Sequence, residues 1–329
     1  MSHPDWWIYT GAGTPREIDD EQWPSPPPWR TFHGIVRHEP ERGVADTRQG
    51  ATFRATEKLV ELVNTALYLR RPILLTGKPG TGKSSLAHAV AYELSLGRVL
   101  EWPITTRTTL ADGIYHYDAI GRLQEQQFTK STPQISPYLR LGPLGTAFLP
   151  TDRPRVLLID EIDKSDIDLP NDLLHIFEQG TFTIPELARM AQHDASAAVR
   201  PVDSEEPVPT ERGTITCKEF PLVILTSNGE REFPPAFLRR CLRLTLRPPE
   251  HHELMAIISA HFRDLDPSLH AHMRELVDRF LTHRKKGELS TDQLLNALYF
   301  TRNHIDISKD SLIETVWRHL NSSDAPEDA

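Results

Sequence analysis

The sequence predicts an α/β fold in which a parallel five-stranded sheet is sandwiched by helices and a small all-α domain follows. Strand-like apolar runs alternate with helical segments over the middle of the chain, which is typical of a parallel sheet. Ile159 and Ile224 lie inside near-continuous apolar runs, as strands buried on both faces require. After Pro248 and Pro249 only helical patterns remain. The five expected strands cover residues 73–76, 99–102, 156–159, 222–226 and 242–246.

Length and composition bound the class of protein. The 329 residues, 38% of them hydrophobic, suffice for a real core and for two units of about 150 residues each. A net charge of −9 gives no strongly basic field for non-specific nucleic-acid binding. No window approaches the length of an apolar membrane span and the N-terminus lacks a signal-peptide pattern, so neither membrane insertion nor secretion is expected. Only Cys217 and Cys241 occur, in no zinc or disulfide spacing, which favours a reducing cytoplasm.

Residues 1–50 are expected to form a distinct N-terminal arm rich in proline and tryptophan. The first 40 residues hold seven of the 27 prolines and four of the six tryptophans. The three prolines at 26–28 forbid a helix and favour an extended course, whereas a solvated linker has little use for indoles. The arm is therefore expected to dock, either on its own domain or on a neighbouring subunit or protein partner. The four indoles belong to Trp6, Trp7, Trp23 and Trp29.

The rest of the chain divides at the change of pattern. Residues 51–247 are expected to form the α/β domain, which opens with a helix over 56–69 whose apolar residues follow helical spacing. Four prolines and three acidic residues near 181–214 predict an exposed insertion. Residues 248–320 carry four helical apolar sets, and the polar, acidic tail 321–329 is expected to fray.

The strongest local signal is the run Gly77-Lys78-Pro79-Gly80-Thr81-Gly82-Lys83-Ser84, between an expected strand and an expected helix. This is a P-loop in its required context: the glycines turn backbone amides around a polyphosphate, Lys83 reaches the terminal phosphates, and the Ser84 hydroxyl ligates Mg²⁺. The residues expected to bind the nucleotide are Gly77, Pro79, Gly80, Thr81, Gly82, Lys83, Ser84 and Ser85.

Acidic and polar residues follow two of the later strands. Asp160 and Glu161 end the run 156–159, a pattern that suits phosphoryl transfer: Asp160 would hold Mg²⁺ and Glu161 would orient the attacking water. Asn228 follows the run 222–226, although Asn-Gly alone is usually a turn. Arg239 and Arg240 precede the last strand, either as solvated surface or as an arginine finger acting on a neighbouring subunit's nucleotide.

The order of these elements resembles the AAA+ ATPases, over about residues 54–320. Within that superfamily the chain is most similar to the MoxR family of the helix-2-insert clade. This finer resemblance rests on residues 113–123, read as the clade's inserted hairpin near 112–127, on the run 141–144, and on 160–164. The arm's opening, at 6–11, is similar to MoxR-like ATPases of bacterial conflict modules, which have a von Willebrand A-domain partner.

The resemblance implies roles that spacing alone does not give. Asn228 becomes sensor 1, Arg240 the finger and Arg239 an assisting arginine. ATP and Mg²⁺ become the expected cofactors, and a homo-oligomer, a hexameric ring, becomes the expected assembly, which remodels or activates a protein client or the A-domain partner. One departure concerns sensor 2: where the family places an arginine, this chain has 290–293, Ser-Thr-Asp-Gln, which reads as a helix capping box. Basic residues at 284–286 are possible substitutes.

Two other functions stay open. A nucleic-acid motor or restriction-type subunit driven by GTP or ATP is disfavoured by the negative charge and by the lack of a basic segment interleaved with aromatics. A nucleotide-gated scaffold with little turnover is disfavoured by intact Glu161 and Arg240, while the missing sensor 2 arginine keeps it open. The choice between ATP and GTP is not made by the P-loop, because that loop reads phosphates.

Overall fold

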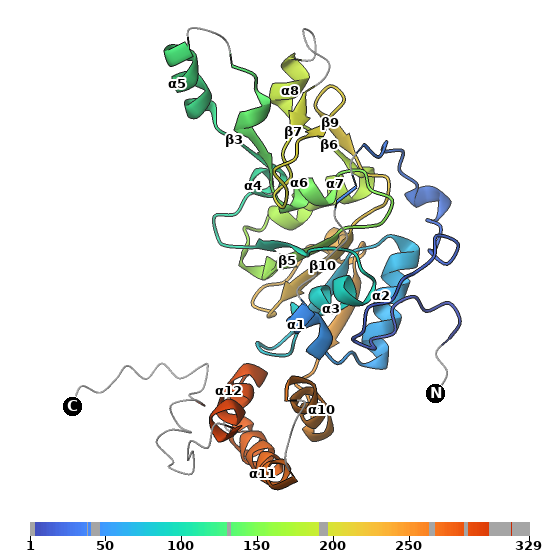
Figure 1. Cartoon of the computed structure of the whole chain (residues 1–329), viewed down its shortest axis with the longest axis vertical. Helices are drawn as coiled ribbons and strands as arrows, with labels where there is room; N and C mark the ends of the chain where they lie inside the picture. The colour runs from blue at the N-terminus through green and yellow to red at the C-terminus, as the bar shows by residue number, and fades with distance from the viewer. Residues whose placement is uncertain are drawn as a thin grey trace, which may run out of the picture.

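Figure 1 shows a computed structural model in which the sheet lies between two helical layers, with the C-terminal helices at one end and two insertions at the other. The structure describes residues 4–37, 39–40, 47–129, 133–190, 197–262, 267–285, 289–302 and 317. Among these residues no helix is long and apolar enough to cross a membrane.

The predicted parallel five-stranded sheet is confirmed, in the order β11-β1-β10-β5-β2. β1, which leads into the P-loop, is held in place because it pairs with β10 on one side and β11 on the other. Ile73 lies opposite both Ile224 and Leu242. All five strands end at the same edge, where the polar residues follow. The strands are β1 (Ile73–Gly77), β2 (Leu100–Pro103), β5 (Val156–Asp160), β10 (Leu222–Ser227) and β11 (Leu242–Leu246).

Helices cover both faces of this sheet, because alternate strand residues point to opposite sides. Leu74 packs into one core, whereas Ile73 and Leu75 pack into the other. The helix predicted over 56–69 is α2 (Glu57–Leu69), and with α3 (Ser85–Glu93) it covers the second core. Outside the two insertions, the other helices described in the α/β part are α1 (Thr47–Thr52), α4 (Leu110–Ile114), α6 (Pro143–Ala147), α7 (Leu169–Gln179) and α9 (Pro235–Leu238), with short 3₁₀ turns at Pro28–Arg30, Ser136–Tyr138 and Ile162–Lys164.

The N-terminal arm lies on its own domain. Ile8 and Tyr9 are buried in the core beneath α2. The buried Asn64 side chain accepts from both of their backbone N–H groups, at 2.7 and 3.0 Å, and donates to the Tyr9 carbonyl at 2.7 Å. Glu93, also fully buried, accepts from the N–H and the hydroxyl of Thr10 at 2.6 and 2.8 Å. Two polar side chains thus fix the arm's backbone as a strand partner would.

Of the two docking places that the sequence left open for the arm, the chain's own domain is the one that Trp7 and Trp23 contact. Both pack against the core under α2 and α3, and the Arg153 guanidinium lies 4.6 Å from the Trp23 ring centroid. Trp6 contacts the Tyr68 ring and keeps 41% of its surface exposed, whereas Trp29 is 79% exposed. Two of the arm's four indoles are thus partly buried within the chain, and the other two are exposed.

The expected hairpin near 112–127 differs from the structure. Only its first strand, β3 (Tyr115–Tyr117), lies in that range, and the chain then forms α5 (Ala119–Thr129) before the antiparallel partner β4 (Leu139–Leu141). The insert is therefore a strand-helix-strand unit. The helix could not be predicted from an apolar pattern, because α5 carries no buried residue.

The insertion near 181–214 is folded, not simply exposed as expected. β6 (Thr181–Thr183) pairs with β9 (Thr214–Thr216), and between them lie α8 (Pro185–Met190), β7 (Ala198–Val199) and β8 (Val208–Pro209). The N–H of Leu141 donates to the Arg200 carbonyl at 2.7 Å, so the two insertions support each other. The apolar residues that give this region a core are Ile184, Leu187, Val199, Val208 and Ile215.

Within the described residues after the α/β part, three helices form what we call the lid: α10 (His251–His261), α11 (Pro267–Arg284) and α12 (Thr291–Arg302). Their shared core includes Phe280 and Leu298. Trp317 is buried in it, with its ring centroid 5.6 Å from that of Phe280. The rest of the fourth expected helix and the tail 321–329 lie outside the described residues.

Candidate active site

The P-loop follows β1, and its Lys83 side chain has three hydrogen-bond acceptors, two in the loop and one on Asn228. Gly77, Gly80 and Gly82 have φ of 152°, 72° and 83°, which residues with a Cβ rarely adopt. The Lys83 ammonium donates to the carbonyls of Gly77 and Lys78 at 2.7 and 3.0 Å and to Asn228 Oδ1 at 2.8 Å. Burial lowers the pKa of Lys83, and the neighbouring carboxylates act in the opposite direction. The loop therefore places the Lys83 cation at the carboxyl edge of the sheet.

Ser84 and Asp160 meet beside it. Ser84 Oγ donates to Asp160 Oδ1 at 2.7 Å, so hydroxyl and carboxylate oxygens converge on one point between α3 and β5. Hard oxygen donors of this kind suit Mg²⁺. No group of three or more His, Cys, Asp or Glu side chains able to hold a metal occurs in the described part of the chain. This donor set fits a Mg²⁺ ion that takes its remaining ligands from phosphates and water.

Thr226, which sequence reasoning missed, ties the acidic pair to β10. Its hydroxyl donates to Asp160 Oδ1 at 2.5 Å and accepts from the Glu161 N–H at 2.9 Å. Thr226 is 1% exposed. A threonine directly after the apolar run 222–225 and two positions before Asn228 was the signal that could have found it.

Glu161 adopts a left-handed backbone conformation, with φ of 59°. A non-glycine residue held there stores strain of about 1–3 kcal/mol, a feature that clusters at functional sites. The Glu161 carboxylate accepts from Lys164 Nζ at 2.6 Å through Oε2, and Asn228 Nδ2 lies 3.5 Å from Oε1. Lys164 was absent from the predicted site.

Asp163, which sequence reasoning also missed, positions Asn228 through a hydrogen bond to its backbone N–H. It is 3% exposed, and its Oδ2 accepts from the N–H groups of Asn228 and Glu230 at 2.9 and 3.0 Å. The Asn228 side chain thereby reaches both Lys83 and Glu161. The structure brings the predicted Asn228 to the predicted Lys83, Asp160 and Glu161.

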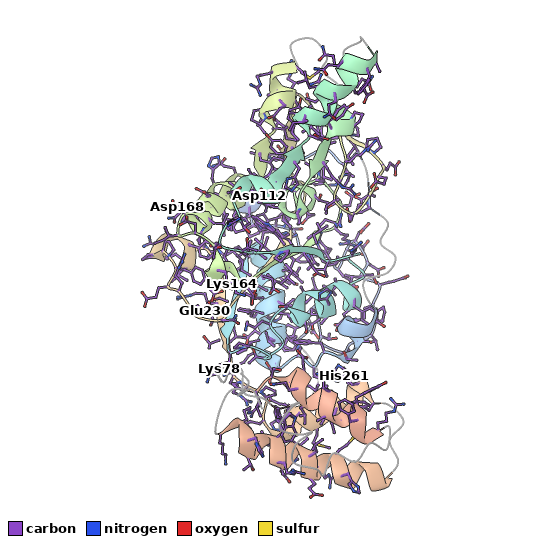
Figure 2. All side chains as sticks on the ribbon, turned by 90° about the vertical axis from the view of Figure 1, so that its left-hand side faces the viewer. Lys78, Asp112, Lys164, Asp168, Glu230 and His261 are labelled. Atoms are coloured by element: carbon purple, nitrogen blue, oxygen red, sulfur yellow. The ribbon has the colours of Figure 1, made fainter. Side chains whose placement is uncertain are left out.

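One cavity of about 860 Å³ lies between the α/β part and the lid, and it is bordered by Lys83, Ser84, Asp160, Glu161, Thr226 and Asn228 but not by Asp163 or Lys164. In Figure 2, Lys78 and His261 lie at the level where the lid meets the α/β part, with Lys164 and Glu230 above them. Of the predicted nucleotide-binding residues all but Gly77 line the cavity. The lining that sequence reasoning missed comes from the end of α1 to the start of α2, from the end of β11 and the turn after it, and from the lid: Thr52, Phe53, Arg54, Ala55, Thr56, Leu59, Leu246, Arg247, Pro249, His252, Glu253, Ala256, Ile257, His261, Thr291, Asp292 and Leu295.

The lid reaches the P-loop through the start of α12. Thr291 Oγ1 donates to the Gly80 carbonyl at 2.9 Å, and a Cβ on Gly80 would lie 2.3 Å from that of Ser290. Half of the expected capping box is present: the Ser290 N–H donates to Gln293 Oε1 at 2.8 Å. The reciprocal bond from Gln293 N–H goes to the Ser290 carbonyl instead of its hydroxyl.

The sensor 2 position presents a carboxylate to the cavity, because Asp292 lines it. Arg284, one of the possible substitutes, donates to the Pro249 carbonyl at 2.9 Å and does not line the cavity. Lys286 lies outside the described residues. Arg247 does line the cavity, where its guanidinium pairs with Glu253 at 3.1 Å.

Arg239 and Arg240 are not brought to this cavity. Arg239 is exposed, and Arg240, 41% exposed, donates through Nε to Glu178 Oε1 on α7 at 2.5 Å. Within one chain, therefore, neither guanidinium reaches the P-loop.

The comparison with protein families agrees with this geometry. A family model described as AAA domain (dynein-related subfamily) matches residues 72–241, more than half of the chain. The match spans the P-loop, the Asp160-Glu161 pair, Asn228 and both arginines. Domains of this family in general use ATP and Mg²⁺ and hydrolyse nucleotide. No curated protein matches the chain. Sheet order, P-loop context and the extent of the match agree, and the chain belongs to the dynein-related subfamily of AAA domains.

Proposed function

We propose that this protein is a MoxR-like AAA+ ATPase that hydrolyses Mg-ATP within a hexameric ring and uses the reaction to remodel or activate a protein partner in the cytoplasm. The observation that carries the proposal is the convergence of Lys83, Ser84, Asp160 and Glu161 on one cavity.

The site's own residues divide the chemistry between them. P-loop amides and Lys83 bind the β- and γ-phosphates, while Ser84 and Asp160 hold Mg²⁺, which neutralises phosphate charge when bound. Glu161 orients the attacking water and accepts its proton. Asn228 contacts both Lys83 and Glu161, so it holds the phosphate-binding ammonium and the catalytic base in fixed positions relative to each other.

The MoxR assignment and the A-domain partner are the finer part of the proposal. The strand-helix-strand insert β3-α5-β4, placed before α6, supports the helix-2-insert reading. The tryptophan-rich N-terminus supports a conflict-module setting. The ring is supported by Arg240: its exposure and its distance from the chain's own cavity suit action on a second copy's nucleotide.

One observation favours a second candidate, a nucleotide-gated scaffold with little turnover. Asp292 lines the cavity where the resemblance expects an arginine, and a carboxylate there weakens rather than strengthens phosphate binding. Steady turnover that depends on Glu161 would exclude this alternative.

Subunit mixing tests the ATPase and its ring together. Glu161→Gln and Arg240→Ala should each bind Mg-ATP but lose at least about 100-fold in turnover. Mixing them should restore some activity, because an interface between an Arg240→Ala site and a Glu161→Gln neighbour regains both groups. Arg189→Ala, at an exposed arginine on α8, is the matched control and should leave turnover unchanged. Failure of every mixing ratio to rescue would argue against action between subunits, and parallel assays with GTP decide the nucleotide.

A further inference from the structure

Two exposed ion pairs hold the two groups on which the proposed reaction depends. Glu161 Oε2 is 2.6 Å from Lys164 Nζ, and Arg240 Nε is 2.5 Å from Glu178 Oε1. Each of the four side chains is about equally exposed, from 40% to 45%. A single chain therefore keeps its base paired with an ammonium and its finger paired with a carboxylate.

We propose that these two pairs exchange partners when one subunit docks on the next: Arg240 leaves Glu178 for the neighbour's nucleotide, Glu178 takes the neighbour's Lys164, and the neighbour's Glu161 is released. The inference rests on the proposed function, since it needs Arg240 to act in a second copy's site. It assigns to Lys164 and Glu178 a positioning role that neither the fold nor the family match gives.

Electrostatics explain why an exchange is needed. The site that receives Arg240 already holds Asp160, Glu161 and Asp163, and it would also hold the phosphates. Because Glu178 is bonded to Arg240, docking the finger carries another carboxylate to the same place, and like charges brought together there cost free energy. Lys164, which is bonded to Glu161 in the receiving site, supplies the cation that compensates the charge of the incoming Glu178.

In the exchange, Arg240 passes from Glu178 to the nucleotide and Lys164 passes from Glu161 to Glu178, so that Glu161 alone loses its ionic partner. Before docking, both pairs lie within a chain. After docking, one pair joins Lys164 to Glu178 across the interface, and Glu161 is left to act on water. Exposed pairs contribute little within one chain, so breaking them is cheap, whereas the same charges in a dehydrated interface are coupled more strongly.

A charge-reversal cycle tests the exchange by assembly, not by activity. Sedimentation velocity would measure association of the full chain with Mg²⁺ and a non-hydrolysable ATP analogue. Lys164→Glu and Glu178→Lys should each weaken association about tenfold, and the double variant should recover to within about threefold of the parent, because the reversed charges pair across the interface. If either reversal fails to fold, Lys164→Gln and Glu178→Gln give the same cycle with neutral groups: each should weaken association about threefold, non-additively.

The exposed pair Lys218 and Asp152, 2.5 Å apart, gives the matched control. Its reversals should leave association unchanged. Additive losses at Lys164 and Glu178, with no recovery in the double variant, would overturn the exchange while leaving the ring intact. A parent chain that stays monomeric with the analogue at all concentrations would instead overturn the ring itself.

Discussion

Lys83 connects three parts of the site through one ammonium group. Its bonds to the Gly77 and Lys78 carbonyls and to Asn228 occupy all three of its protons. Because burial already disfavours its charge, the cation gains more from a polyphosphate than a surface lysine would.

The first prediction follows from this position. Lys83→Ala should abolish measurable Mg-ATP binding, a loss of at least about 100-fold in affinity, since a charge-assisted contact to phosphate is removed from a partly buried site. Isothermal calorimetry checks it, with Lys218→Ala as a control at an exposed lysine. Equal affinity in the variant and the parent would contradict the site.

Thr226 gives a second prediction at this scale. Thr226→Val keeps the shape of the side chain but removes the donor to Asp160 and the acceptor for the Glu161 N–H. Turnover should fall about tenfold and the Mg²⁺ requirement should rise, while ATP affinity measured without Mg²⁺ should change little. A metal titration of turnover would show it; an unchanged Mg²⁺ dependence would place Thr226 outside the site.

Individual residues also show where sequence reasoning stopped. Lys83, Ser84, Asp160 and Glu161 were predictable because phosphate chemistry demands those residue types at fixed places after a strand. Thr226, Asp163 and Lys164 were not, since they act by holding other residues in place. Thr226 and Asp163 do so through the register between strands that are far apart in the chain, whereas Lys164 pairs locally with Glu161. Only β10 placed beside β5 brings Thr226 to Asp160.

Among the elements, the start of α12 combines a cap with a contact to the P-loop. Gln293→Ala removes the acceptor for the Ser290 N–H, so the free energy of unfolding should drop by about 1 kcal/mol with turnover nearly unchanged. Thermal melting and ATPase assays on the same sample separate the two effects. An unchanged melting temperature together with a several-fold change in nucleotide affinity would show that Gln293 serves the cavity instead.

The arm is the second element whose role can be measured. Asn64→Ala leaves two buried N–H groups and one carbonyl without their partner and should destabilise the domain by about 2–4 kcal/mol. The neighbouring Glu61→Ala, at an exposed position of the same helix, should cost less than about 0.5 kcal/mol. Denaturant unfolding compares the two. Equal stability of both variants would mean that the arm is not part of the core.

The arm also illustrates why composition misleads about location. Its prolines and indoles predicted a docking segment, but Asn64 and Glu93, which bind its backbone, lie in helices 55 to 83 residues later and belong to no motif. Both residues are polar and fully buried, which sequence periodicity treats as exceptions. The same limit hid α5 within the insert, because a helix with no buried face has no apolar period to detect.

At the scale of the whole molecule, the two thiols report on folding. Cys217 and Cys241 are buried, and burial raises the pKa of each from 9.0 to about 12. Because the folded-state pKa is higher than the unfolded one, the thiols' contribution to stability is complete below about pH 9 and is lost as the pH rises toward 12.

Thiol labelling is the matching experiment. At pH 8 neither cysteine should react in the native protein, and both should react along the denaturant transition, in step with the loss of secondary structure. Denatured protein supplies the control of two reactive thiols. Fast labelling of one cysteine before global unfolding would reveal local opening near the corresponding strand.

The sheet order also determines when β1 can pair with its neighbouring strands during synthesis. β1, which carries the P-loop, finds its neighbours only in β10 and β11, so Ile73 must wait for Ile224 and Leu242, 151 and 169 positions later. At a ribosomal rate of about 5–20 residues per second this delay is roughly 8 to 34 seconds. During that interval β1 has neither of its neighbouring strands to pair with, and α2 and α3 are the helices that can cover its apolar residues. A nascent chain stopped before residue 222 is thus expected to depend on chaperones, and one released after residue 246 is not.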